Sequence, residues 1–330
     1  MSPKTTLLPW QQQPWQRISQ YIQQNRIPQA LLITGANGIG KYTLAHRFAA
    51  ALLCERRTKD GLACGQCHSC TLISAQTHPD FITIVPEVDK MSISINQIRQ
   101  IVADTYLKPQ FDGYRIVIIK PAEVMTIQAI NAFLKCLEEP GERTVFILIT
   151  TKPSKLPATI ISRCQQLALS LSDPHTLREW LNSQYIRQNQ ETLINLVQNS
   201  ILSLEQIGDA VLLTQRRDCF KDWLAIAKQQ MHPVLVSEKW QKLPKQTLIN
   251  WQLSWLSDVI KCAFRIQHQQ MCNQDLVQSI QSLVQQLQLS QVYKLYDKLI
   301  YCRQQLDTQL NFQLMLEEVL IQWQGLNRRH

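Results

Sequence analysis

The sequence carries a glycine-rich stretch of the kind that binds phosphate groups. Gly35, Gly40 and Lys41 match the pattern G-x-x-x-x-G-K, and Gly38 lies inside it. In such loops the backbone N–H groups of the loop and of the following helix surround the phosphates, and the lysine reaches the β and γ oxygens. The pattern predicts a phosphate-binding loop, although a glycine-rich turn kept only for packing would read the same way.

Two departures from the pattern argue against magnesium chemistry. Tyr42 stands where a Ser or Thr hydroxyl would bind the metal, and Thr43, also counted with the loop, is rotated by about 100° around the helix. The apolar run that ends at Ile119 is followed by Lys120 and Pro121, where an ATPase carries the carboxylates that hold magnesium and orient water. We therefore expect no magnesium site and no hydrolysis by the isolated chain, while bound ATP or ADP stays an open alternative.

Four cysteines have the spacing of a metal site, C-x9-C-x2-C-x2-C, at Cys54, Cys64, Cys67 and Cys70. Three thiols on a turn and a fourth from the end of the preceding helix can converge on one ion in a tetrahedral all-sulfur site. In a reducing compartment the pattern predicts a structural zinc ion, with free or disulfide-linked thiols as the alternative. His68 and His78 could compete as ligands, but we expect both at the surface.

A single arginine, Arg163, lies in the segment Ser162-Arg163-Cys164, which follows an apolar run and a short basic stretch. On a short turn there, its side chain could reach outward to a neighbouring molecule. The alternative is an arginine in an ordinary surface ion pair. A carboxylate candidate, Glu123, follows Lys120 by three residues, and we expect it to be an exposed glutamate in the first turn of a helix.

Composition limits the class of protein. The 330 residues are 45% apolar and 18% charged, which is typical of folded globular proteins. Basic residues exceed acidic ones by 34 to 25, and this net charge of +9 fits contact with a polyanion without requiring it. Neither the pattern of a signal peptide nor an apolar stretch of about 20 residues is present. We therefore expect a soluble cytoplasmic protein without a membrane partner.

The chemistry-bearing residues follow elements that alternate between strand and helix. Short apolar runs predict buried strands, and amphipathic stretches predict the helices between them. Strands are expected at 30–34, 81–85 and 115–119 and before Thr150, with helices at 8–26, 41–53 and 95–106. This order predicts a doubly wound α/β domain whose ligand lies at the carboxyl ends of the strands. From 170 onward only helices are expected, including 220–231, 248–268, 275–289, 292–306 and 310–323.

Taken together, these motifs resemble the clamp-loader branch of the AAA+ proteins. The resemblance is carried by Trp10 and Trp15, ALLITGANGIGK at 30–41, the cysteine module at 54–70, NAFLKCLEEP at 131–140 and LITTKPSKLPATIISRCQQL at 148–167. It implies an AAA+ α/β P-loop domain with a zinc module at 1–167, an all-α lid at 168–215 and an all-α collar at 216–330. In the lid, Asn199-Ser200 stands near the family's Gly-Ser…Arg element, and no arginine follows closely.

The resemblance also implies a function. A clamp loader is a hetero-pentamer of catalytic gamma/tau subunits, a delta subunit and a non-hydrolysing subunit, and it loads the sliding clamp onto primer–template DNA. Arg163 matches the family's arginine finger, which acts in trans on the ATP of a neighbouring subunit, and Thr150 or Thr151 occupies the sensor position. The missing magnesium contacts favour the non-hydrolysing role. Two alternatives are a gamma/tau-like ATPase that tolerates Tyr42 and a zinc-ribbon protein that binds nucleic acid.

Overall fold

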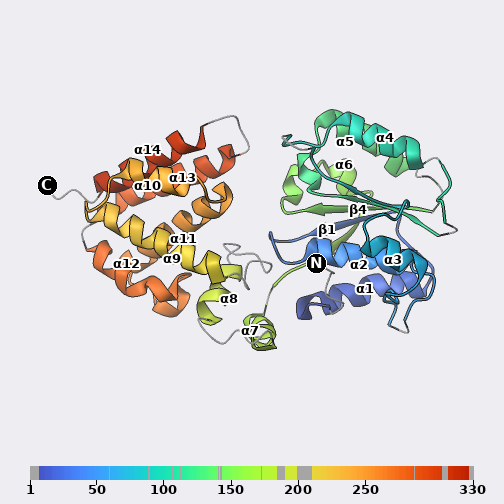
Figure 1. Cartoon of the computed structure of the whole chain (residues 1–330), viewed down its shortest axis with the longest axis horizontal. Helices are drawn as coiled ribbons and strands as arrows, with labels where there is room; N and C mark the ends of the chain where they lie inside the picture. Colours follow the sequence, from blue (N-terminus) through green and yellow to red (C-terminus); the bar gives the residue numbers. More distant parts are fainter. Residues whose placement is uncertain are drawn as a thin grey trace. The chain divides into compact units, whose positions relative to one another are not determined.

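A computed structural model of the chain shows two compact units, Met1–Thr176 and Leu177–His330 (Figure 1). It describes residues 7–326 except 59, 88–89, 106, 112, 140, 142, 172, 184–189, 199–209, 286 and 307–310. Asn199-Ser200, the expected lid element, therefore lies outside the described residues. Each unit has a hydrophobic core of its own and is described separately below.

The first unit is built on a five-stranded sheet in the order β2-β3-β4-β1-β5, and every neighbouring pair is parallel. Its strands are β1 (Ala30–Thr34), β2 (Phe81–Ile84), β3 (Arg115–Ile119), β4 (Thr144–Thr150) and β5 (Gln165–Ala168). The middle strands β1, β3 and β4 are almost wholly buried, which explains their continuous apolar runs, because helices cover both faces of a parallel sheet. The four strands expected from the sequence are present, and β5 is an additional edge strand.

Helices on both faces complete this unit (Figure 1). They are η1 (Pro9–Gln11), α1 (Gln12–Gln23), α2 (Lys41–Leu53), α3 (His68–Ser74), α4 (Ile95–Thr105), η2 (Ala122–Val124), α5 (Ile127–Glu138), η3 (Pro153–Lys155) and α6 (Ala158–Ile161). The Thr126 side chain caps α5 by accepting a hydrogen bond from the Ala129 N–H. Phe133 of α5 meets Phe146 of β4 edge to face, with ring centroids 5.1 Å apart, and this contact fixes α5 against the sheet.

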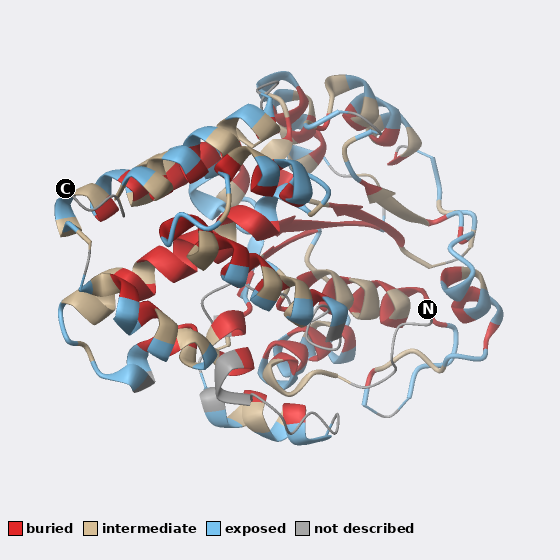
Figure 2. Cartoon of the chain, turned by 60° about the vertical axis from the view of Figure 1, so that its left-hand side comes forward, coloured by how far each residue is buried: buried red, intermediate tan, exposed pale blue. Residues whose placement is uncertain are grey.

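The second unit is entirely helical in its described residues. Its helices are α7 (Pro174–Ser183, shared with the end of the first unit), α8 (Gln190–Gln198), α9 (Ala210–Ala227), α10 (Pro233–Trp240), α11 (Lys245–Ala263), η5 (His268–Gln270), η6 (Gln274–Leu276), α12 (Val277–Val284), α13 (Leu289–Gln305) and α14 (Phe312–Leu326). Buried residues line the inner sides of these helices (Figure 2). The helix α10 was not expected from the sequence, and α9 runs continuously through the expected lid–collar boundary at 215–216.

A cluster of tryptophans forms the centre of the second unit. The rings of Trp223 (α9) and Trp323 (α14) are stacked with centroids 3.8 Å apart, and the Trp323 indole N–H donates to the Trp223 carbonyl at 2.9 Å. Trp255 of α11 lies 5.5 Å from Trp223. These contacts bring α9, α11 and α14 together and bury one side of α14, which carries Phe312, Leu316, Val319, Leu320 and Trp323.

A buried polar network holds the segment around η6 to its neighbours. The Arg216 guanidinium, 1% exposed, donates to both carboxylate oxygens of Asp275 and to the side-chain oxygen of Asn273. Asp258 of α11 is fully buried and accepts from the backbone N–H groups of Cys272 and Asn273. Buried charges of this kind are tolerated because each is paired and hydrogen-bonded.

Candidate functional site

The glycine loop has the backbone that its sequence predicts. Gly35, Gly38 and Gly40 have φ values of 146°, 73° and 85°, a region that side chains rarely adopt. A Cβ at Gly35 would lie 2.3 Å from the Leu169 carbonyl oxygen, and one at Gly40 would lie 2.7 Å from the Gln11 amide nitrogen. Packing therefore requires glycine at positions 35 and 40 whether or not a phosphate binds, so these glycines alone do not identify a nucleotide site.

Lys41 points into its own loop. Its Nζ donates to the carbonyl oxygens of Gly35 at 2.9 Å and Ala36 at 2.5 Å. Burial lowers the pKa of Lys41 to about 8, opposed by the nearby negative charge of Glu123. In this arrangement the ammonium stabilises the loop conformation by satisfying two of its carbonyl groups.

Residues from the beginning of the chain occupy two further carbonyls of the loop. The Trp10 indole N–H donates to the Ile39 carbonyl at 3.0 Å, and the Gln11 side-chain amide donates to the Gly40 carbonyl at 2.9 Å. Gln11 is fully buried. Sequence reasoning missed Gln11, and its only signal was a polar residue beside the tryptophans of an otherwise amphipathic segment.

The two residues that depart from the ATPase pattern are in contact. The Nζ of Lys120, which follows β3, lies 3.2 Å from the centroid of the Tyr42 ring at the start of α2. This distance is a close cation–π contact. In the sequence, Tyr42 and Lys120 are two separate departures from the ATPase pattern. In the structure they contact each other, and this contact places the Lys120 ammonium beside the glycine loop. Thr43 lies half-buried in the first turn of α2.

Glu123 is half-buried, so the expectation of an exposed glutamate is wrong. Its Oε1 accepts from the Thr151 N–H at 3.0 Å and from the Thr151 hydroxyl at 2.7 Å. Burial alone would raise the pKa of Glu123, but these hydrogen bonds outweigh it and the pKa is lowered. The neighbouring Thr150 is buried at the end of β4, where its hydroxyl accepts from the Lys152 N–H.

These side chains gather at the carboxyl ends of the strands. Thr34 and Thr150 are paired in register, and Lys120 follows β3, so the loop, the threonines and the lysine all lie at the carboxyl ends of the strands. The Oε1 atom of Glu123 accepts from Thr151, whereas its Oε2 atom is buried and has no hydrogen-bond partner among the residues that the structure describes. The side chain that follows β3 is the ammonium of Lys120, so this position offers no oxygen ligand to a divalent metal.

The four cysteines converge as the sequence predicts. Their sulfur atoms all lie within 4.8 Å of one another, with 3.8 Å between Cys54 and Cys67 and 4.0 Å between Cys64 and Cys70. Four sulfurs at about 2.3 Å from a tetrahedral zinc ion lie roughly 3.8 Å apart, which is close to the spacing of this cluster, so the four thiols fit a zinc ion. None of these cysteines forms a disulfide.

Backbone amides surround the Cys64 sulfur. The N–H groups of Gln66 and Cys67 donate to it at 3.5 Å and 3.3 Å, and they lower the pKa of Cys64 to about 6. Burial instead raises the pKa of Cys54 and Cys70. Because Cys54 ends α2 and Cys70 lies in α3, an ion held here would fasten α3 to α2.

The two histidines near the cluster differ from each other. His68 is exposed, as expected, but His78 is buried, so the surface prediction for His78 is wrong. The Nδ1 of His78 accepts from the Asp80 N–H at 3.1 Å, and its ring packs against Phe111. Burial lowers the pKa of His78, which fits a neutral ring that serves packing.

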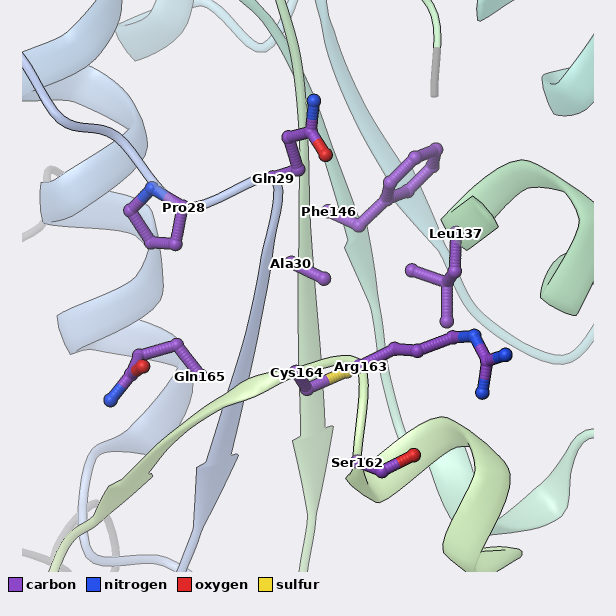
Figure 3. A pocket seen from close by; sticks show the side chains of 9 residues that line it. All are labelled: Pro28, Gln29, Ala30, Leu137, Phe146, Ser162, Arg163, Cys164 and Gln165. Carbon is purple, nitrogen blue, oxygen red and sulfur yellow. The ribbon is translucent and has the colours of Figure 1, made fainter. Parts of the chain in front are cut away.

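Arg163 lies on the turn between α6 and β5, and its side chain is 37% exposed. One terminal nitrogen forms a 2.8 Å ion pair with Glu138 at the end of α5, and the other donates to the Thr159 carbonyl at 3.0 Å. A shallow cavity of about 300 Å³ lies beside it (Figure 3). It is lined by Pro28, Gln29, Ala30, Leu137, Phe146, Ser162, Arg163, Cys164 and Gln165.

Arg163 and the glycine loop lie at opposite ends of two neighbouring strands, β5 and β1. Arg163 comes two residues before β5, which begins beside Leu31, whereas the loop follows Thr34 at the other end of β1. The strand β5 from Gln165 to Ala168, the partner of Thr34, spans roughly 10 Å of extended chain, and Arg163 precedes it on the turn. Arg163 is therefore far from the glycine loop of its own chain and is exposed where a neighbouring molecule could meet it.

None of the helices in the described part of the chain is both long and apolar enough to cross a membrane.

Comparisons with known proteins cover both units. A family model described as "DNA polymerase III, delta subunit" matches residues 10–173, and one described as "DNA polymerase III, delta subunit, C terminal" matches residues 211–325. The chain is 33% identical to "DNA polymerase III subunit delta′" of Pseudomonas aeruginosa over 97% of this chain and 98% of that protein. It is 27% identical to the Escherichia coli (strain K12) protein of the same name, over 95% and 94%. The chain is also 33% identical to "DNA polymerase III subunit tau/gamma" of Haemophilus influenzae, over 48% of this chain and 23% of that protein.

Proposed function

The chain belongs to the family of DNA polymerase III delta′ subunits, and from this premise we propose that it is a non-hydrolysing clamp-loader subunit whose Arg163 completes the ATP site of a neighbour. The observation that carries this proposal is the position of Arg163. It is partly exposed at the amino ends of the strands, whereas its own glycine loop lies at their carboxyl ends. A residue placed there can serve a nucleotide only in another subunit.

The proposed chemistry uses the geometry of the guanidinium. A fixed fork of N–H donors can bind two oxygens of a γ-phosphate and stabilise the charge that develops as the phosphoryl group is transferred. An arginine supplied in trans contributes about 10³- to 10⁵-fold to such rates in known systems. The neighbour would be a gamma/tau subunit, and the 33% identity to a tau/gamma protein over 161 residues supports a shared architecture of the AAA+ type.

The proposed absence of hydrolysis rests on the loop itself. Lys41 donates hydrogen bonds to two carbonyl groups of the loop. Lys120 and Tyr42, which contact each other, occupy the two positions at which an ATPase carries its magnesium-binding side chains. Productive ATP hydrolysis requires a magnesium ion that bridges the β and γ phosphates and a group that orients water. In this chain the loop instead serves to anchor Trp10 and Gln11.

The remaining parts have supporting roles in the proposal. Zinc at the four-cysteine cluster would be structural, because all four positions are protein thiols and no position stays open for a substrate. The helical second unit would form the lid and the collar of a hetero-pentamer with gamma/tau and delta subunits. The pentamer would open the sliding clamp and place it on primer–template DNA, and this role would put the protein in the bacterial cytoplasm.

The test is a reconstituted complex that carries Arg163→Ala. Assembly should be unchanged, because the exposed side chain supports no core, while the ATPase rate at the adjacent site should fall at least 100-fold. Arg17→Ala, at an exposed arginine on α1, is the matched control. Unchanged ATP turnover in the assembled Arg163→Ala complex would refute the trans role.

A second measurement separates this reading from a gamma/tau-like ATPase. The isolated chain should not hydrolyse ATP in the presence of magnesium, because its loop lacks both magnesium contacts. Turnover by the isolated chain at the rate of catalytic relatives would favour the ATPase reading instead.

A further inference from the structure

The Arg163 side chain is held from two sides by different elements. Its Nη2 is 2.8 Å from the Glu138 carboxylate at the end of α5, and its Nη1 donates to the Thr159 carbonyl of α6 at 3.0 Å. A guanidinium has five N–H donors, so these two contacts leave donor capacity for a further acceptor. The two contacts therefore fix the direction of the guanidinium group and leave some of its N–H groups able to donate to another acceptor.

The ion pair has little value for stability. Both side chains are exposed, Arg163 by 37% and Glu138 by 53%, and exposed pairs contribute little to folding because solvent screens them. Glu138 is also the last residue of α5, and a carboxylate at the C-terminus of a helix is opposed by the helix dipole. The helix itself therefore gains nothing from a negative charge at this position.

The ion pair does affect the orientation of the Arg163 side chain. A free arginine side chain samples many rotamers, and binding an acceptor with it requires that this freedom be lost. A side chain already held in one direction loses less freedom when it meets a phosphate. The carboxylate of Glu138 supplies such a hold from a well-packed helix, because Phe133 and Cys136 of α5 are buried in the core of the sheet.

We propose that Glu138 is a positioning residue for Arg163, which it holds in the orientation that meets the γ-phosphate bound by the neighbouring subunit. This inference rests on the function proposed above. Glu138 touches neither the nucleotide nor the reacting atoms. Its effect reaches the reaction only through the direction of the Arg163 guanidinium.

The test compares Glu138→Ala with Glu138→Gln in the reconstituted complex. Glu138→Ala should lower kcat at the adjacent ATP site about 3- to 10-fold with little change in KM, since only the orientation of a group that acts in the transition state is lost. Glu138→Gln keeps an oxygen acceptor and should recover most of the rate. Glu139→Ala, at the adjacent exposed glutamate, is the matched control and should match the wild-type rate.

A double variant separates positioning from a general structural role. If Glu138 acts only through Arg163, then Glu138→Ala should cause no further loss in an Arg163→Ala background. Thermal unfolding of the isolated Glu138→Ala chain should match the wild type.

Three results would overturn the positioning role: an unchanged or higher kcat in Glu138→Ala, failure of Glu138→Gln to recover the rate, or a full additional loss in the double variant. These results are distinct from failure of the proposed function, which would appear as an unaffected Arg163→Ala complex. An affected Arg163→Ala complex with an unaffected Glu138→Ala complex would remove the positioning role alone.

Discussion

The contact between Lys120 and Tyr42 predicts that the two departures from the ATPase pattern act as one unit. The perturbation is a cycle of three variants: Lys120→Met, Tyr42→Leu and the double variant. Lys120 Nζ is 3.2 Å from the ring centroid, and both residues are half-buried. A cation–π contact contributes about 0.5–1 kcal/mol when exposed and about 2 kcal/mol when desolvated, so a half-buried pair should be coupled by about 1 kcal/mol.

The coupling should be measured with probes that lie in the first unit of the whole chain, because the two units need not unfold together. Hydrogen exchange of amides in β1 and β3, the buried strands beside the contact, reports the free energy of opening the sheet. Each single variant should destabilise these strands, and the double variant should cost about 1 kcal/mol less than the sum of the two. Strict additivity, with a coupling below about 0.3 kcal/mol, would show that Lys120 and Tyr42 do not stabilise the sheet as a pair.

Two further predictions concern neighbouring groups. Burial lowers the pKa of His46, and the positive charges of Lys120 and Arg47 lower it further, so Lys120→Met should raise the pKa of His46 toward its ordinary value in an NMR titration; an unchanged titration would contradict this placement of the Lys120 charge. Cys67→Ser should abolish binding of a zinc ion and weaken exchange protection in α3, whereas Cys262→Ser should keep both, as measured by elemental analysis and hydrogen exchange. Zinc retained in full by Cys67→Ser would contradict the four-sulfur site.

The sequence predicts elements well where local pattern decides the structure. The strands at 30–34 and 115–119 appear at the expected residues, because continuous apolar runs between turn residues have one good location in a parallel sheet. The strand β5 was not identified, since only Leu167 of its four residues is buried. The short helix α10 was also missed, because eight residues give too little periodicity to recognise.

In the candidate site, too, contacts between residues close in sequence were predicted and contacts between distant residues were not. The four cysteines are close in sequence, so their spacing alone predicts their convergence, and the structure confirms the cluster. The contacts between Lys120 and Tyr42 and between Glu138 and Arg163 join residues that are distant in sequence. No local pattern encodes such pairs, because only the order of strands and the packing of α5 bring them together.

The most direct test of the account is a single-turnover count of ATP hydrolysed by the assembled complex. In the proposed function, Arg163 serves one neighbouring ATP site and the chain itself hydrolyses no ATP. Replacing wild-type chain by Arg163→Ala should therefore remove the rapid hydrolysis of one ATP per complex and leave the other sites active. An identical rapid count in both complexes would contradict it.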